Sequence, residues 1–78
     1  SHDCRLADGA TLGPGARLAG GVEVGEGAEI GIGAQVLPRL RVGAGALVAA
    51  GAVVTADVPE GALAIGVPAR LRARKPRH

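Results

Sequence analysis

The sequence contains no phenylalanine, tyrosine, tryptophan or methionine. Without aromatic residues, any core consists of aliphatic side chains and alanine. No ring is available to stack on a nucleic-acid base either, so we expect no nucleic-acid partner. Because an initiator methionine is also missing, we interpret the 78 residues as a fragment or a processed form of a longer chain.

Cysteine and long apolar runs are equally scarce. Cys4 is alone, so no disulfide can form within the chain, which fits a reducing compartment. No apolar run reaches the roughly 20 residues of a membrane span, and no signal-peptide pattern is visible. We therefore expect a cytoplasmic location and no membrane span.

Negative charge is missing from the C-terminal end. Residues 1–60 carry four basic and seven acidic side chains, whereas residues 61–78 carry five basic and no acidic ones. The net charge of +2 therefore belongs to the tail. A short basic tail of this kind is usually a solvated segment, although it also suits an anionic ligand.

The dominant feature of the sequence is a six-residue repeat. One series of aliphatic residues recurs at every sixth position and consists of Leu6, Leu12, Leu18, Val24, Ile30, Val36, Val42, Val48 and Val54. A second apolar residue follows each of them four positions later, as Ala10, Ala16, Val22, Ala28, Ala34, Leu40, Ala46, Ala52 and Val58. A fixed repeat this short predicts a parallel β-helix rather than an α-helix or ordinary strands.

The composition of the repeat indicates how the chain turns. Glycine precedes most residues of the second series, and it suits corners where the backbone takes positive φ. Three hexads then make one triangular coil, so residues 18 apart should stack about 4.8 Å from each other. We expect one ladder of Leu6, Val24 and Val42, a second of Leu12, Ile30 and Val48, and a third of Leu18, Val36 and Val54.

We predict an all-β fold of about three coils over residues 1–59, followed by a C-terminal cap and basic tail over residues 60–78. Pro59 and Gly61 mark the end of the regular hexads, and the apolar run 63–69 should fold back over the open end of the helix. Three coils bury little apolar surface and leave strand edges open, so we expect self-association or a missing N-terminal part.

Two stretches leave alternatives open. The hexad 36–41 carries Arg39 where most others have glycine, and Arg39 and Arg41 suit either an anionic ligand or a plain exposed corner. The run 43–55 is rich in glycine and alanine, and its smooth outer wall suits a long, thin ligand or the packing of subunits. From composition alone, His2 is most simply an exposed terminal histidine.

The hexads, the passage GAGALVAAGAVVTADVPEGALAIGVPAR and the opening HDC resemble the hexapeptide-repeat acyltransferases. Within that family, the same residues most resemble the sialic-acid O-acetyltransferase and bacillosamine-pathway N-acetyltransferase type. It implies a left-handed β-helix, although crossovers between parallel strands are usually right-handed. It further implies a homotrimer, acetyl-CoA between neighbouring prisms, and transfer of the acetyl group to a hydroxyl or amine of a sugar or nucleotide sugar. The chain would then be the C-terminal fragment of a longer enzyme.

The resemblance also assigns roles to individual residues. His2 matches the general base, and Asp3 matches an acidic residue that supports it, although Asp8 or another subunit could supply that carboxylate. Thr11 stands where close relatives have a second histidine. The remaining candidates for acetyl-CoA are Gly20, Ile32 and Ala50 for the pantetheine arm, and Arg70, Arg72 and Lys75 for the phosphates. No metal is expected.

Two other classes share this repeat. A non-catalytic trimerisation module would show the same hexads and needs no base. A metal-dependent hydratase of the γ-carbonic-anhydrase kind needs three histidines for zinc, whereas this sequence has only His2 and His78. We rank the acetyltransferase first, the scaffold second and the hydratase last.

Overall fold

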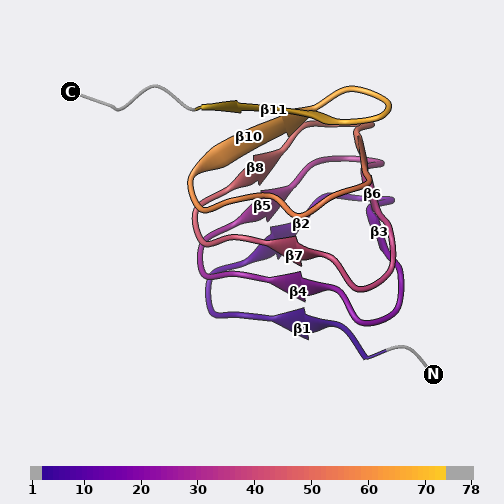
Figure 1. Ribbon diagram of the computed structural model, residues 1–78. Helices are drawn as coiled ribbons and strands as arrows, with labels where there is room; N and C mark the ends of the chain where they lie inside the picture. The colour runs from indigo at the N-terminus through magenta and orange to yellow at the C-terminus, as the bar shows by residue number, and fades with distance from the viewer. Residues whose placement is uncertain (1–2, 74–78) are drawn as a thin grey trace.

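The computed structural model describes residues 3–73, which contain strands and turns and no helix. Figure 1 shows the strands stacked in layers from the N-terminal end to the C-terminal end. The strands are β1 (Arg5–Leu6), β2 (Thr11–Leu12), β3 (Arg17–Leu18), β4 (Glu23–Val24), β5 (Glu29–Ile30), β6 (Gln35–Val36), β7 (Arg41–Val42), β8 (Leu47–Val48), β9 (Val53–Val54), β10 (Ala62–Ile65) and β11 (Arg70–Ala73).

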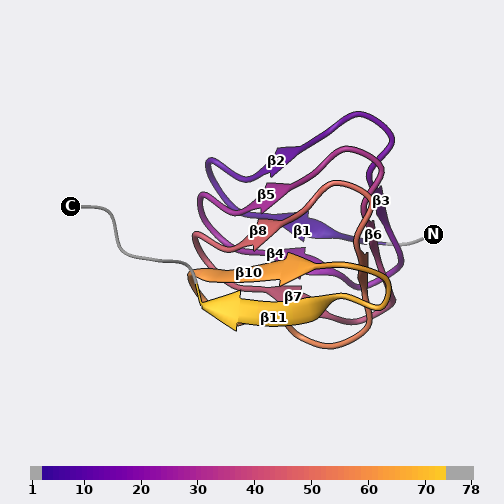
Figure 2. The same ribbon diagram turned by 90° about the horizontal axis from the view of Figure 1, so that it is seen from above.

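These strands form the three faces of a triangular prism. Within each face the strands run parallel, except for β11 at the end of sheet B. Sheet A contains β1, β4 and β7, sheet C contains β3, β6 and β9, and sheet B has the order β11-β10-β8-β5-β2. Seen from above in Figure 2, β2, β5, β8 and β10 lie side by side along one face. The fold is the left-handed parallel β-helix that the repeat and the resemblance predicted.

The register confirms the three predicted ladders. Leu6 pairs with Val24 and Val24 with Val42, and the same spacing of 18 residues joins the members of the other two ladders. The core consists of aliphatic residues and alanine alone, and no charged or polar residue among those described is buried. Inward Leu6 and Leu12 at the N-terminal end of the prism remain 49% and 42% exposed, because no coil covers them within the described residues.

Glycine is required at the corners for two different reasons. Gly33 has a φ of +68°, a conformation that L side chains rarely adopt, and an added Cβ there would meet nothing within 4 Å. Gly31 instead lies against the next coil, where an added Cβ would come within 2.6 Å of the backbone nitrogen of Ala50. Arg39 takes the same left-handed conformation as its glycine counterparts, with a φ of 63°.

The last coil departs from the predicted register. Val58 forms a bridge with Val42 and is buried, so it belongs to the first series rather than to the second. The step from Val54 to Val58 is therefore four residues instead of six, and Asp57 does not occupy a glycine position. Its carboxylate Oδ1 accepts a hydrogen bond of 2.9 Å from the backbone N–H of Arg41, which fixes the shortened turn.

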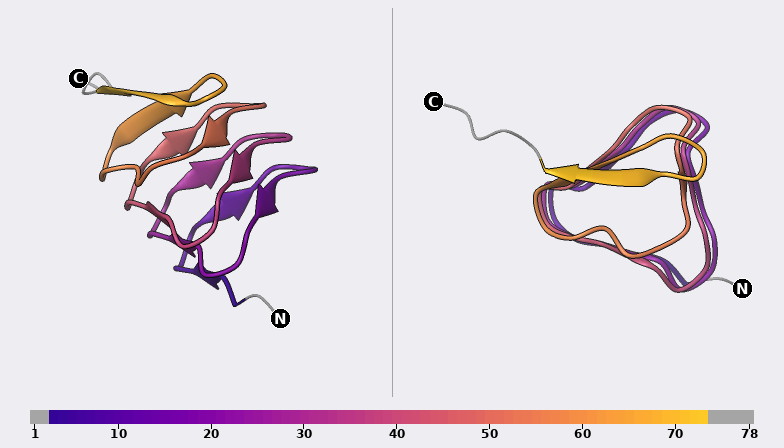
Figure 3. Two further views of the ribbon diagram at one scale, coloured as in Figure 1. Left: turned by 45° about the vertical axis from the view of Figure 1, so that its right-hand side comes forward. Right: turned by 45° about the horizontal axis from the view of Figure 1, so that its top comes forward.

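The regular stacking then resumes in β10. Gly61 takes the corner conformation with a φ of +68°, and Ala64 pairs with Val48. Strand β11 turns back and pairs antiparallel with β10. In the end-on view of Figure 3, β11 crosses the C-terminal end of the triangle. The apolar run 63–69 does not fold back as a whole, because its first residues extend sheet B in β10.

Candidate functional site

Asp3, the predicted partner of the base, belongs by its register to the turns that lead from sheet C to sheet A, which we call the Gly20 corner (residues 19–21, 37–39 and 55–57). Because Arg5 pairs with Glu23, Asp3 falls one coil below Gly21 in the register. Asp3 is exposed, and Gly20 is half-buried with its carbonyl accepting the N–H of Arg39 at 2.9 Å. His2 lies outside the described residues.

Cys4 ties the start of the described chain to the Gly20 corner. Its half-buried thiol donates to the carbonyl of Ala19 at 3.2 Å and lies 3.8 Å from that of Leu18. Asp3 is therefore held beside the corner. Sequence reasoning did not find this contact, although the signal was present, since Cys4 lies 18 residues before inward-facing Val22.

A second group of predicted residues lies at the turns from sheet B to sheet C, which we call the Ile32 corner (residues 13–15, 31–33 and 49–51). Ile32 and Ala50 stack one coil apart, because the N–H of Gly51 donates to the carbonyl of Ile32 at 2.8 Å. The Ile32 side chain is 63% exposed, and Ala50 is exposed as well. The corner thus presents a column of small and apolar groups along the prism.

Thr11 and two of the residues predicted for the phosphates, Arg70 and Arg72, border this corner. Thr11 is exposed in β2 on the outer face of sheet B. In β11, Arg70 pairs with Ile65, one residue beyond the pair formed by Ala64 and Val48, so Arg70 lies at the C-terminal end of the Ile32 corner. Arg72 is two residues away on the same face of β11 and is also exposed. Lys75 lies outside the described residues.

The predicted residues therefore form two groups. Asp3 and Gly20 occupy one vertex of the triangular cross-section, while Thr11, Ile32, Ala50, Arg70 and Arg72 lie at or next to another. The whole of sheet C separates the two vertices, as the end-on view of Figure 3 makes visible. The structure does not bring the two groups together within one chain.

The geometry also bears on two alternatives considered from the sequence, Asp8 as the supporting carboxylate and a metal site. Asp8 lies at the third corner, where its carbonyl accepts the N–H of Gly27 at 3.2 Å. Within one chain it is therefore at a different vertex from Asp3. Among residues 3–73 there is no group of three or more His, Cys, Asp or Glu side chains that could hold a metal ion.

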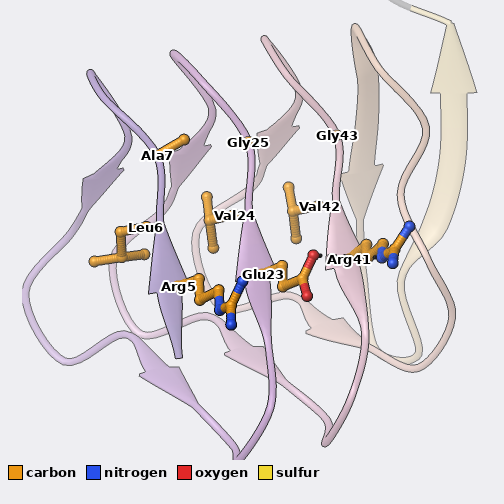
Figure 4. A pocket seen from close by; sticks show the side chains of 9 residues that line it. All are labelled: Arg5, Leu6, Ala7, Glu23, Val24, Gly25, Arg41, Val42 and Gly43. Atoms are coloured by element: carbon orange, nitrogen blue, oxygen red, sulfur yellow. Dashed lines mark ion pairs between the residues drawn. The ribbon is translucent and has the colours of Figure 1, made fainter. Parts of the chain in front are cut away.

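The prism also has a hollow of about 350 Å³ that contains none of the residues assigned by the resemblance, although Arg41 lines it. It lies over sheet A and is lined by residues of β1, β4 and β7 and of the turns that follow them, namely Arg5, Leu6, Ala7, Glu23, Val24, Gly25, Arg41, Val42 and Gly43. Figure 4 shows Arg5, Glu23 and Arg41 in a row along it, with an ion pair of 3.4 Å between Arg41 and Glu23.

The three-sided prism, its hexads and its glycine corners define the chain as a hexapeptide-repeat protein. Residues 21–56 match the family described as bacterial transferase hexapeptide (six repeats). The resemblance to the hexapeptide-repeat acyltransferases is thereby confirmed. A comparison with curated protein sequences found no match. No helix in the described part of the chain is long and apolar enough to cross a membrane.

Solved structures of sugar acetyltransferases are similar to this chain. A histidine variant of perosamine N-acetyltransferase from Caulobacter crescentus, in complex with CoA and GDP-perosamine, is 51% identical with a TM-score of 0.89, over 92% of this chain and 34% of that one. The acetyltransferase domain of PglB from Neisseria gonorrhoeae, in complex with acetyl coenzyme A, is 40% identical with a TM-score of 0.87, over 88% and 34%.

A third structure extends the range of similar proteins. UDP-N-acetylglucosamine acyltransferase from Campylobacter jejuni is 32% identical with a TM-score of 0.89, over 92% of this chain and 29% of that one. The chain thus spans about a third of the length of the proteins it matches.

Proposed function

We propose that the chain is the coenzyme-binding β-helix of an enzyme that transfers an acetyl group from acetyl-CoA to an amine or hydroxyl of a sugar or nucleotide sugar. The observation that carries this proposal is the 51% identity, over 92% of the chain, to an N-acetyltransferase solved with CoA and GDP-perosamine. An amine is the better-supported acceptor, because the similar perosamine enzyme is an N-acetyltransferase.

The chemistry requires a base next to the acceptor. A sugar amine or hydroxyl attacks the thioester carbonyl while its proton is removed, and an imidazole performs this transfer near neutral pH. We assign this role to His2. Asp3 is the acidic partner that orients the imidazole and stabilises its protonated form, since Cys4 holds Asp3 beside the Gly20 corner and Asp8 belongs to another vertex.

The Ile32 corner fits the long arm of the coenzyme. Ile32 and Ala50 offer an exposed apolar column on a backbone that neighbouring coils hold rigidly. Arg70 and Arg72 supply fixed cations at one end of that column, and together with Lys75 they suit the phosphates. Thr11 offers a hydroxyl on the adjoining face, and Gly20 lies at the other corner, next to Asp3 in the register.

A homotrimer reconciles the two vertices. A coenzyme that contacts the Ile32 corner of one copy and the Gly20 corner of its neighbour would meet both groups of residues at once. We therefore propose that each site is shared between two subunits. A cytoplasmic location stays a prediction that rests on the lone Cys4.

The experiment separates the base from the coenzyme site in the full-length protein. His2→Ala should leave acetyl-CoA binding intact and lower turnover by roughly a hundredfold or more. Replacing Arg70, Arg72 and Lys75 with alanine should weaken acetyl-CoA binding, most clearly at low salt, and should change single-turnover chemistry on bound coenzyme little.

Arg17→Ala is the matched control, because Arg17 is an exposed arginine on sheet C that belongs to neither corner. Calorimetric titration and single-turnover kinetics measure the two effects. Absence of acetyl-CoA binding by the wild-type protein at millimolar ligand would refute the enzyme and leave the alternative, a non-catalytic trimerisation module.

A further inference from the structure

The outer face of sheet A carries a row of alternating charges that the proposed function does not use. Each residue in the row immediately precedes an inward residue of the first ladder. From the N-terminal coil onward, the row is Arg5, Glu23, Arg41 and Asp57, and we call it the charge ladder. All four residues are exposed. The signs therefore alternate as plus, minus, plus, minus along the prism.

The alternation depends on the shortened turn before Val58. In the uninterrupted hexad register, Glu60 would have stood in the first series and Pro59 would have preceded it, with no charge at the fourth rung. The step of four residues instead places Asp57 beside Arg41, where its carboxylate is held by the backbone N–H of Arg41. The fourth rung is thus fixed by a specific contact.

The charges are only partly satisfied within the chain. Glu23 and Arg41 form one ion pair of 3.4 Å, but their side chains remain 48% and 75% exposed. Arg5 has no ion pair with any described residue at the N-terminal end of the row. The hollow beside the ladder passes over Gly25 and Gly43, so long side chains of a facing molecule have room there (Figure 4).

The order of signs selects one orientation of a partner. Reversing plus, minus, plus, minus gives the complementary series, so a second copy placed antiparallel sets Arg5 against Asp57 and Glu23 against Arg41. A parallel copy would set every charge against its own kind. The earlier coils nearly superimpose in the end-on view of Figure 3, so Arg5, Glu23 and Arg41 follow one line along the prism. The shortened last coil departs from that outline, and its Asp57 is placed beside Arg41 by the bridge between Val42 and Val58.

We propose that sheet A is an interaction surface for a second copy of this chain, bound face to face and antiparallel through the charge ladder. The Gly20 corner borders sheet A and shares Asp57 with the charge ladder, but Glu23 and Arg41 belong to neither corner. Substitution of these two residues therefore tests the surface separately from the proposed function. One four-rung face is smaller than a standard protein interface, so we expect weak association that is seen only at high protein concentration.

Charge reversal gives a sharp test by sedimentation velocity at concentrations up to about 1 mM. Glu23→Arg and Arg41→Glu should each weaken self-association by at least about tenfold, because each places two like-charged pairs in the antiparallel dimer. A mixture of the two variants should associate again, since every rung of one then faces the opposite charge of the other. The double variant carrying both reversals should associate like the wild type.

Glu29→Arg is the matched control, because Glu29 is exposed in the same coil but on sheet B. It should leave the association unchanged, and raising NaCl from about 0.05 M to about 0.5 M should weaken the wild-type complex. The proposal is overturned if the wild type shows no association beyond its low-concentration species. It is also overturned if Glu29→Arg acts like Glu23→Arg, or if the mixed variants fail to recover.

Discussion

Individual residues in this prism differ sharply in their tolerance of substitution, because neighbours along a strand face opposite environments. Val48 is fully buried between Ile30 and Ala64, whereas Leu47 beside it faces outward and is half-buried. Within residues 3–73, no polar or charged side chain is buried that a new charge in the core could meet. A polar substitution should therefore lower stability strongly at an inward position and only slightly at the outward position next to it.

Val48→Asp should unfold the chain. Burial of a carboxylate without a partner costs about 3–5 kcal/mol, which is a large share of the roughly 5–15 kcal/mol that keeps a small protein folded. Leu47→Asp is the control and should shift the melting temperature only slightly. Circular dichroism measures both, and a native spectrum with an unchanged melting point for Val48→Asp would contradict the inward assignment.

At the scale of the elements, the coils are held at a fixed distance by glycines that allow backbone to touch backbone. Gly25 and Gly43 repeat the situation of Gly31, since an added Cβ would lie 2.6 Å and 2.5 Å from a backbone nitrogen of the next coil. At the positive-φ glycines Gly27, Gly33 and Gly51, an added Cβ would instead meet nothing within 4 Å. Substitution is therefore limited by a steric clash with the next coil at one kind of glycine and by the positive φ at the other.

Gly31→Ala should lower the free energy of unfolding by about 1–3 kcal/mol or more, because the contacted atoms are backbone and cannot move aside without separating the coils. Gly33→Asn should cost less than about 1 kcal/mol, since asparagine tolerates the left-handed conformation and Arg39 already adopts it. Urea denaturation followed by circular dichroism compares the two. Equal losses would show that the coil spacing is not limited by Gly31.

The whole molecule is a short prism whose two ends differ. Strand β11 crosses the C-terminal end, whereas Leu6 and Leu12 are exposed at the N-terminal end. A core of small side chains provides limited stabilisation for one chain of this length. Association of several copies is the simplest way in which such a prism gains buried surface.

We expect the chain to form a homotrimer at micromolar concentration, as the shared site of the proposed function requires. Sedimentation equilibrium or light scattering gives the mass directly. The salt-sensitive pairing through sheet A should appear only at much higher concentration, so the two associations can be separated. A folded monomer at micromolar concentration would contradict the trimer.

The sequence by itself determined the β-helix, its three inward ladders and the residues at its corners. A period of six with glycine at the turns is satisfied by one arrangement, because each hexad meets the same local requirements of an inward aliphatic residue and a left-handed corner. The resemblance that the same residues carry pointed to the family. Those properties are local, and the sequence displays them at nearly every repeat.

Only the tertiary structure decided the features that depend on distant partners. The shift of Val58 onto Val42 follows from the strand pairing and the buried contact available there, together with the hydrogen bond from the backbone of Arg41 to Asp57. That shift completes the charge ladder. The hydrogen bond from the Cys4 thiol to the carbonyl of Ala19, which holds Asp3 at the Gly20 corner, likewise joins residues that lie far apart in the sequence.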